Sequence, residues 1–244
     1  MALSDRLAPK VIHTSHAYTR YTNAGTALLE RGPATVLDVG AGRQWHFPPS
    51  LKKPGMNLIG FDIDIAEMSD NALLDRKVSG DACQGLGVPD QSVDLIMGRA
   101  VIEHLHDTES FLIGANAALR ENGHLIITFP NKHAPFAVLN RILPRRAAKW
   151  LLTHLVPGSS GTLGFEAFYD RASYREFKQG LIDAGFDIEE EYVSYFSSWY
   201  YFQFFVPLFI VGLALDSLFY ALKRPRFAAY LTFVGRKPAR AALS

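Results

Sequence analysis

The chain has 244 residues, and its 25 Lys and Arg nearly balance 24 Asp and Glu, giving a formal net charge of +1. That length suits one large domain or two small ones, and a 48% hydrophobic content with almost no net charge argues against intrinsic disorder. The balanced charge also argues against a nucleic-acid-binding surface built on a basic surplus. The single cysteine, Cys83, excludes an intrachain disulfide and a four-cysteine zinc site, and it suits a reducing cytoplasm.

The first half of the chain alternates short β-branched runs with stretches of helical periodicity, which predicts a parallel sheet with crossover helices. The expected strands are residues 35–39, 57–61, 78–81, 93–97 and 125–129. Apolar residues at helical spacing predict a helix over 110–119, and Gly123 is expected to end it in a left-handed conformation.

The second half has a less regular pattern. A helix broken at Pro144 is expected over 134–155, followed by a loop at 157–161. Ser173 is a candidate N-cap for a helix over 173–184 that Gly185 would end. Strands are expected at 186–195 and 229–235, on either side of a segment rich in aromatic residues.

Glycine and acidic residues follow the first three expected strands. Gly40 and Gly42 come after the first strand, where they would let the backbone turn sharply and approach a ligand. Asp62 follows the second strand, 22 residues after Gly40, where its carboxylate can accept both hydroxyls of a ribose. Asp81, at the third, can accept from an exocyclic amine or cap a loop. Since ligands of open parallel sheets bind beyond the carboxyl ends of the strands, this order predicts a nucleotide site.

Motifs at these positions resemble those of a known enzyme family. VLDVGAG at 36–42 resembles the first motif of class I S-adenosylmethionine-dependent methyltransferases, and LIGFDI at 58–63 resembles their second-strand signature. SGDA at 79–82 resembles their adenine-side loop, and IEHLHD at 102–107 is similar to the turn after their fourth strand. The match extends over about residues 34–131, and Gln44 stands where many members have a third glycine.

The resemblance implies an α/β fold with a Rossmann-like, mostly parallel sheet of seven strands, one of them antiparallel. Helices would cover both faces. Within a single domain we expect an N-terminal helical lid (1–33), a cofactor-binding core (34–131) and acceptor-side helices (132–184). An apolar segment further predicts a hydrophobic helical insertion (197–227) before the last strand.

The resemblance also implies S-adenosyl-L-methionine as the cofactor. It assigns the methionine part to Asp38, Gly40 and Gly42, and the ribose hydroxyls to Asp62. It assigns the adenine to Ile63, Asp81 and Ala82, and the sulfonium region to Arg99 and Ala100.

The Glu-His turn offers one catalytic candidate. An imidazole titrates near neutral pH, so His104 could take a proton from a hydroxyl nucleophile, although a structural task for the Glu103–His104 pair is the alternative. His104 and His106 are only two residues apart, which puts them on different sides of a helix, so no metal site is expected. Methyl transfer by direct displacement at the sulfonium needs no metal.

Residues outside the core supply weaker candidates. Tyr18, Tyr21 and Thr22 precede the first strand and would either form a lid over the cofactor or pack as an ordinary helix. Glu166 and Tyr169 follow the expected glycine loop, in the region that forms the acceptor wall in relatives.

Residues 199–222 are almost entirely apolar, and 12 of the chain's 30 aromatic residues lie between Tyr192 and Tyr220. Aromatic residues stand at one end (Trp199, Tyr200 and Tyr201) and basic residues follow Leu222 at the other (Lys223, Arg224 and Arg226). The segment is long enough to cross a bilayer, but a single crossing would separate two strands of one sheet. Packing within the protein, a homodimer face and a peripheral membrane contact remain open.

Two functions from different classes follow. The first is an S-adenosylmethionine-dependent methyltransferase acting on a small-molecule or lipid-like acceptor, cytoplasmic and peripheral at the membrane. The second is a catalytically silent cofactor-binding domain that serves as a membrane or partner adaptor. The fold does not choose among O-, N- and C-methylation.

Overall fold

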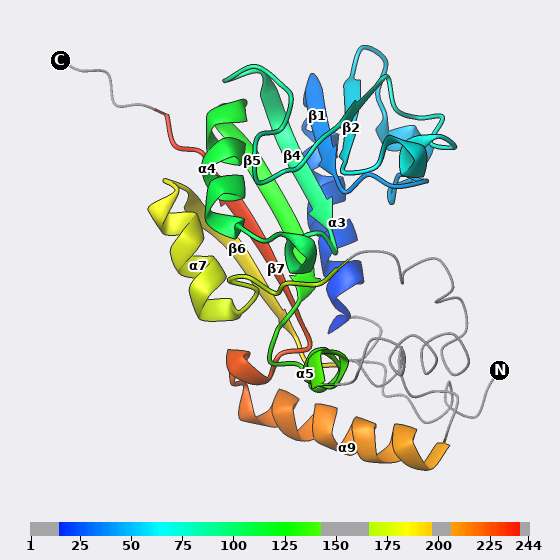
Figure 1. Ribbon diagram of the computed structural model, residues 1–244, viewed down its shortest axis with the longest axis vertical. Coiled ribbons are helices and arrows are strands. Elements are labelled where there is room, and N and C mark those ends of the chain that lie inside the picture. Colours follow the sequence, from blue (N-terminus) through cyan, green and yellow to red (C-terminus); the bar gives the residue numbers. More distant parts are fainter. Residues whose placement is uncertain (1–14, 143–165, 197–205, 240–244) are drawn as a thin grey trace.

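The computed structural model describes residues 15–142, 166–196 and 206–239 (Figure 1). Its centre is a seven-stranded sheet in the order β3-β2-β1-β4-β5-β7-β6. The strands are β1 (Thr35–Val39), β2 (Asn57–Asp62), β3 (Arg76–Ser79), β4 (Val93–Arg99), β5 (Leu119–Pro130), β6 (Asp187–Ser194) and β7 (Tyr230–Arg236). Strand β7 runs antiparallel to both of its neighbours, whereas the pairs among β1 to β5 are parallel. The predicted fold class is confirmed.

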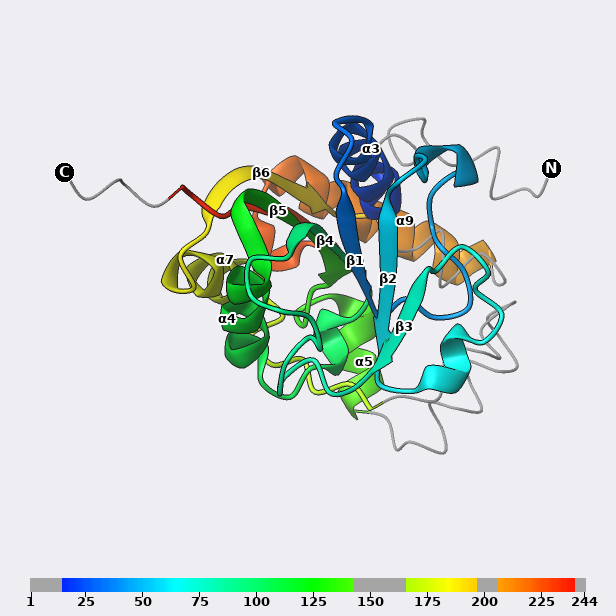
Figure 2. The ribbon, with the colours of Figure 1, turned by 90° about the horizontal axis from the view of Figure 1, so that it is seen from above.

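The sheet is buried on both faces because its central strands are apolar at successive positions. In β1, Val36 packs into one apolar cluster and Leu37 into the other, as alternation along a strand requires. Helices α4 (Thr108–Ala118) and α7 (Tyr174–Asp183) cover one face, and α3 (Ala17–Glu30) covers the other (Figure 2).

The connections after β1 and β2 differ from the predicted crossover helices. They hold only the short 3-10 turns η1 (Pro49–Leu51) and η2 (Ile65–Met68). Three prolines between residues 48 and 54 disfavour an α-helix after β1. The segment covers the sheet instead with the buried side chains of Trp45, Phe47, Leu51 and Met56.

The end of the helix before β5 also differs from the prediction. Helix α4 ends at Ala118, and the left-handed residue is Asn122, with φ 61°, rather than Gly123. Gly123 is required for close packing, because a Cβ there would lie 2.9 Å from the Arg120 carbonyl oxygen.

In the second half, α7 begins after Ser173 and is followed by Gly185 at φ 85°, as predicted. The Ser173 side chain makes no capping bond to the backbone; it donates to Glu176 Oε2 at 2.5 Å. Of the helix expected over 134–155, the structure describes α5 (Pro135–Ile142). The predicted break at Pro144, the loop at 157–161 and the aromatic residues 199–205 lie outside the described residues.

Helix α9 (Val206–Leu222) represents the hydrophobic insertion. No helix among the described residues is long and apolar enough to span a membrane. Strands β6 and β7 on either side of the insertion are antiparallel neighbours in the sheet. This pairing confirms that both strands belong to one sheet, and it agrees with the argument against a single crossing.

The contribution of the buried η1 segment to stability can be tested by shortening one of its side chains. Leu51→Ala removes a side chain that is 7% exposed on the segment that replaces a crossover helix, so we expect a loss of about 2–5 kcal/mol in unfolding free energy. Ile113→Ala, at a position that is 56% exposed on α4, should change the unfolding free energy by less than about 0.5 kcal/mol. Urea unfolding of both variants measures the difference, and equal losses would contradict the packing role.

Candidate functional site

The carboxyl ends of β1 to β4 meet at one edge of the sheet, where the polar residues singled out by the sequence gather. The turn after β1 contains Gly40 and Gly42, which adopt φ 70° and 51°. The N–H groups of Gly40 and Ala41 both donate to the Phe61 carbonyl oxygen, at 2.8 and 3.2 Å. A Cβ at Gly40 would lie 3.2 Å from Val101 Cβ, whereas one at Gly42 would meet no atom closer than 3.9 Å. Gly42 therefore leaves space for a ligand to approach the backbone.

Asp62 lies beside this turn, at the end of β2. Its Oδ2 accepts the Gly42 N–H at 3.1 Å, and its Oδ1 accepts the Asp64 N–H at 3.3 Å. Each carboxylate oxygen has a second lone pair, so the side chain retains capacity for two hydroxyl donors. Next to it, Ile63 is 61% exposed, an apolar surface suited to a flat ring.

Asp38 is buried below the turn. Its side chain is 4% exposed, and its Oδ2 has no hydrogen-bond partner in the described part of the chain. Burial, with a smaller contribution from the Asp62 charge, raises the pKa of Asp38 to about 7. An unsatisfied buried acceptor is costly, and a cationic donor such as an ammonium group would satisfy it.

The end of β4 presents Arg99 and Ala100. The Arg99 guanidinium lies over the Tyr18 ring of α3, with Cζ 3.9 Å from the ring centroid. Ala100 adopts φ 57°, and its N–H donates to the Thr128 carbonyl oxygen at 2.8 Å. Burial, with a smaller contribution from the Arg99 charge, lowers the pKa of His46 to about 4, so this ring is neutral at physiological pH. No motif or spacing in the sequence marks His46 as a site residue.

The Glu-His turn forms the 3-10 turn η3 (Ile102–His104). His104 Nδ1 lies 2.8 Å from the Glu166 carbonyl oxygen, so Nδ1–H donates, and in the neutral ring Nε2 carries the lone pair. Glu103 is 6% exposed, and its Oε2 has no partner among the described residues. Burial raises the pKa of Glu103 to about 8. Only its burial in the fold marks Glu103 as a site residue.

Of the remaining residues singled out by the sequence, some pack in the hydrophobic core and others lie near the carboxyl edge of the sheet. Tyr21 is 1% exposed and packs against Phe47, with ring centroids 5.5 Å apart, so it belongs to the core. Tyr18 lies at the edge, on Arg99. Tyr169 is buried, and its N–H donates to the Glu103 carbonyl oxygen at 3.0 Å, which brings the expected acceptor region to the Glu-His turn.

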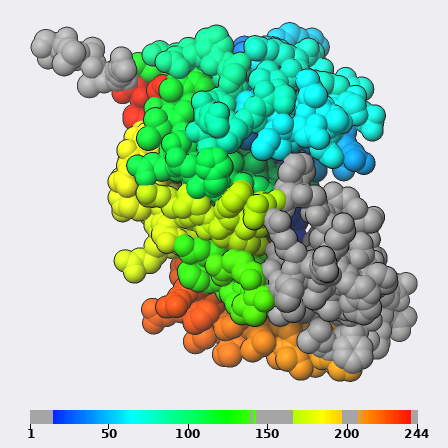
Figure 3. Space-filling view, viewed as in Figure 1, coloured from blue at the N-terminus to red at the C-terminus, as the bar shows by residue number. Residues whose placement is uncertain are grey.

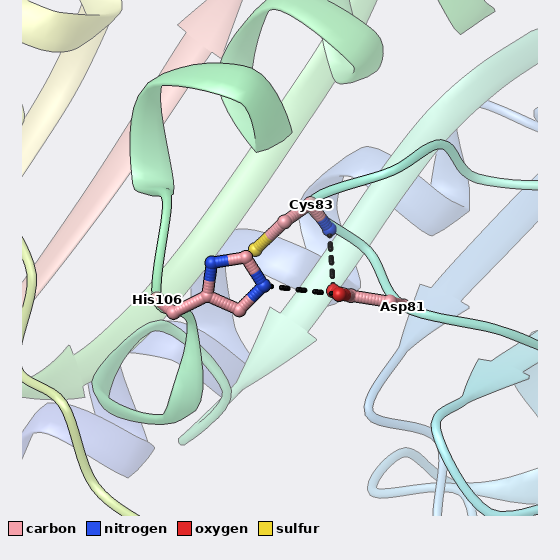
Figure 4. A group of neighbouring side chains, drawn as sticks. All are labelled: Asp81, Cys83 and His106. Carbon is pink, nitrogen blue, oxygen red and sulfur yellow. Dashed lines mark hydrogen bonds and ion pairs between the residues drawn. The ribbon is translucent and has the colours of Figure 1, made fainter.

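The loops after β3 and β4 bring together three side chains that the sequence did not connect (Figure 4). Asp81 Oδ2 lies 3.0 Å from His106 Nε2, and Asp81 Oδ1 accepts the Cys83 N–H at 2.9 Å. Ala82, between them, is 7% exposed. The Cys83 N–H and then His106 lower the pKa of Asp81, whereas burial raises the pKa of the Cys83 thiol. His104 and His106 have different partners, so the two histidines do not form a pair.

Residues 13–191 match a family model described as a methyltransferase domain. No curated protein matches the chain. An S-adenosylmethionine-dependent methyltransferase from Mesorhizobium loti is similar in structure, with TM-score 0.54 and 17% identity over 90% of this chain and 97% of that one.

Two further solved structures share the fold. A Haloferax volcanii complex of the Trm112 methyltransferase activator with a methyltransferase has TM-score 0.54 and 16% identity, over 96% of this chain and 94% of that one. A Haemonchus contortus phosphoethanolamine N-methyltransferase, bound to phosphomonomethylethanolamine and S-adenosylhomocysteine, has TM-score 0.53 and 16% identity, over 91% of this chain and 56% of that one. At these identities the likeness shows the fold alone.

The buried carboxyls predict a pH dependence of stability. Asp38 and Glu103 have folded-state pKa values of about 7 and 8, above their ordinary values of 3.8 and 4.5. Between about pH 5 and pH 7 the folded chain therefore holds more protons than the unfolded chain, and stability falls as pH rises, by up to about 1.4 kcal/mol per pH unit for each group. Glu103→Gln should remove its share of this slope in urea unfolding, and an unchanged slope would contradict the assignment.

Proposed function

The chain belongs to the methyltransferase domain family, and we propose that the carboxyl edge of its sheet binds S-adenosylmethionine as the methyl donor and methylates a small-molecule or lipid-like acceptor. The observation that carries the proposal is the Asp62 carboxylate, which binds the Gly42 N–H between the open glycine turn and the exposed Ile63. Oxygens that can accept from ribose hydroxyls, a turn whose backbone a ligand can approach, and an apolar surface for a flat ring therefore lie side by side.

Each part of the cofactor can be assigned to residues at the carboxyl edge whose chemistry suits it. The orphaned acceptor of Asp38 suits the ammonium of the methionine part, which would lie along Gly40 and Gly42. Asp62 would hold the ribose hydroxyls, and the adenine would pack on Ile63. The remaining contacts are proposed for the adenine edge at Asp81 and Ala82, and for the sulfonium region at Arg99 and Ala100.

The bound cofactor supplies an activated methyl group, so the protein's task is to align the acceptor atom, methyl carbon and sulfur. Alignment of this kind can lower a barrier by roughly 7–11 kcal/mol. For an acceptor that carries a proton, we propose His104 as the general base. The bond from its Nδ1–H to the Glu166 carbonyl oxygen orients the ring and fixes the lone pair on Nε2.

Helix α9 supports a lipid-like acceptor. Its buried side chains include Phe209 and Asp216, at a spacing that marks one narrow stripe of the helix. Around this stripe it exposes large apolar side chains, each at least 41% exposed: Ile210, Val211, Leu215, Leu218, Tyr220 and Leu222. Such an exposed apolar helix suits the interface of a bilayer.

The insertion is attached to the same edge of the sheet as the proposed site. Asn131, directly after β5, donates through Nδ2 to the carbonyl oxygens of Pro225, Arg226 and Ala228. These bonds tie the end of the insertion to the carboxyl edge, and α9 forms the lower rim of the molecule in Figure 3. The exposed Lys223, Arg224 and Arg226 follow α9, where they would meet anionic headgroups. We therefore propose a peripheral contact between this rim and an anionic membrane.

Cofactor binding can be tested at Asp62. Asp62→Ala removes both proposed ribose acceptors and the Gly42 bond, so affinity for S-adenosylmethionine should fall at least about tenfold in calorimetry. Asp64→Ala is the matched control, because this exposed carboxylate accepts the Ala66 N–H instead. If Asp62→Ala binds the cofactor like the unmodified protein, the placement is wrong.

Membrane contact can be tested by placing negative charges on the exposed apolar face of α9. The intact chain should sediment with phosphatidylserine vesicles at moderate salt, and Leu215→Glu with Leu218→Glu should abolish sedimentation because both positions are exposed on α9. Ile113→Glu, on the exposed face of α4, is the control and should sediment normally. Full recovery of the intact chain in the supernatant would contradict the contact, and a concentration-dependent dimer would assign the face to a second copy instead.

A further inference from the structure

The loops after β3 and β4 bring three metal-ligand types together at the carboxyl edge. Asp81 and Cys83 come from the first loop, and His106 comes from the second. One ligand atom from each (a carboxylate oxygen, the thiol sulfur and an imidazole nitrogen) lies within 4.8 Å of the others. Figure 4 shows the carboxylate directed at both of its neighbours. The fold, rather than local sequence spacing, creates this set.

The three ligand atoms lie close enough for small side-chain movements to enclose a tetrahedral metal ion. Zinc bonds of about 2.0–2.3 Å place tetrahedral ligand atoms about 3.3–3.8 Å apart. The present 3.0 Å between Asp81 Oδ2 and His106 Nε2 would have to lengthen slightly. The sulfur lies within 4.8 Å of the other two ligand atoms, so a side-chain movement of about 1 Å would bring it into range. The His106 side chain is 52% exposed, so an ion can reach the set from solvent without unfolding of the loops.

The Cys83 sulfur is the softest ligand atom of the set. The backbone N–H groups of Asp107 and His106 lie beside it. An ion bound to the sulfur would displace the thiol proton. The combination of one thiolate, one imidazole and one carboxylate is a donor set that zinc accepts.

We propose that Asp81, Cys83 and His106 form a binding site for Zn²⁺ or a similar transition-metal ion, with water as the fourth ligand. The site has a regulatory consequence that rests on the proposed function. Because Asp81 is also the proposed acceptor for the adenine edge, a metal ion that takes its carboxylate weakens cofactor binding. The cofactor and the ion then compete for one side chain.

Cobalt spectroscopy of the full chain tests the site without any activity measurement. Reduced, chelator-treated protein titrated with Co²⁺ should develop a thiolate-to-cobalt charge-transfer band at one equivalent, and Zn²⁺ should remove it. Cys83 is the only cysteine, so such a band can come from no other residue. Cys83→Ser should abolish the band, and His106→Gln should weaken Co²⁺ binding at least about tenfold. His133→Gln, which alters an exposed histidine outside the set, should leave it unchanged. No band, or a band that His106→Gln leaves at full affinity, would overturn the proposal.

The regulatory step has a separate readout. Saturating Zn²⁺ should lower the affinity for S-adenosylmethionine by about tenfold or more in the unmodified chain and have no effect in Cys83→Ser. An unchanged affinity with the cobalt band present would retain the metal site and overturn the competition. A cobalt band in a chain that binds no cofactor would retain the metal site and reject the proposed function instead.

Discussion

Three consecutive backbone N–H groups attach the turn after β1 to the end of β2, and the geometry of the site depends on them. Gly40 and Ala41 donate to the Phe61 carbonyl oxygen, and Gly42 donates to the Asp62 carboxylate. Their bonds require left-handed backbone at both glycines, where other residues are strained. The glycine turn and the acidic residue of the next strand thus form one unit. A ligand that binds Asp62 finds the turn already shaped, which lowers the conformational cost of binding.

The same edge carries two buried carboxyl groups whose burial disfavours their charge. Asp38 and Glu103 each have an oxygen without a partner among the described residues, and burial raises both pKa values towards or above neutrality. Without a ligand this arrangement is a cost to stability, because the ionised forms are poorly solvated. S-adenosylmethionine carries an ammonium and a sulfonium cation. A cationic ligand at this edge would offset that cost, so the instability predicted at rising pH and the cofactor proposal have one electrostatic origin.

The sequence was most informative where function and backbone geometry coincide. Gly40, Gly42 and Asp62 follow strand ends, and strand ends are readable because buried parallel strands are continuous apolar runs. The missing crossover helices were harder to predict, because Trp45 and Phe47 cover the sheet from an irregular segment that has no period. The prediction that Gly123 adopts a left-handed conformation was wrong. Glycine is also selected where the backbone approaches another group closely, as Gly123 approaches the Arg120 carbonyl oxygen, and the sequence does not distinguish the two reasons. Glu103 and the Asp81–Cys83–His106 set depend on burial and long-range contacts that no local pattern encodes.

The hydrophobic insertion follows from the sheet topology as much as from its own composition. Since β7 lies between β5 and β6 and starts at the carboxyl edge, the chain must return to that edge before β7 begins. The connection from β6 to β7 therefore starts and ends at the carboxyl edge of the sheet, and Asn131 fixes its last turn to the end of β5. An apolar, lipid-facing helix in this connection would hold the site close to the bilayer surface. A lipid-like acceptor would then reach the methyl group without leaving the interface, which avoids the cost of moving its acyl chains into water.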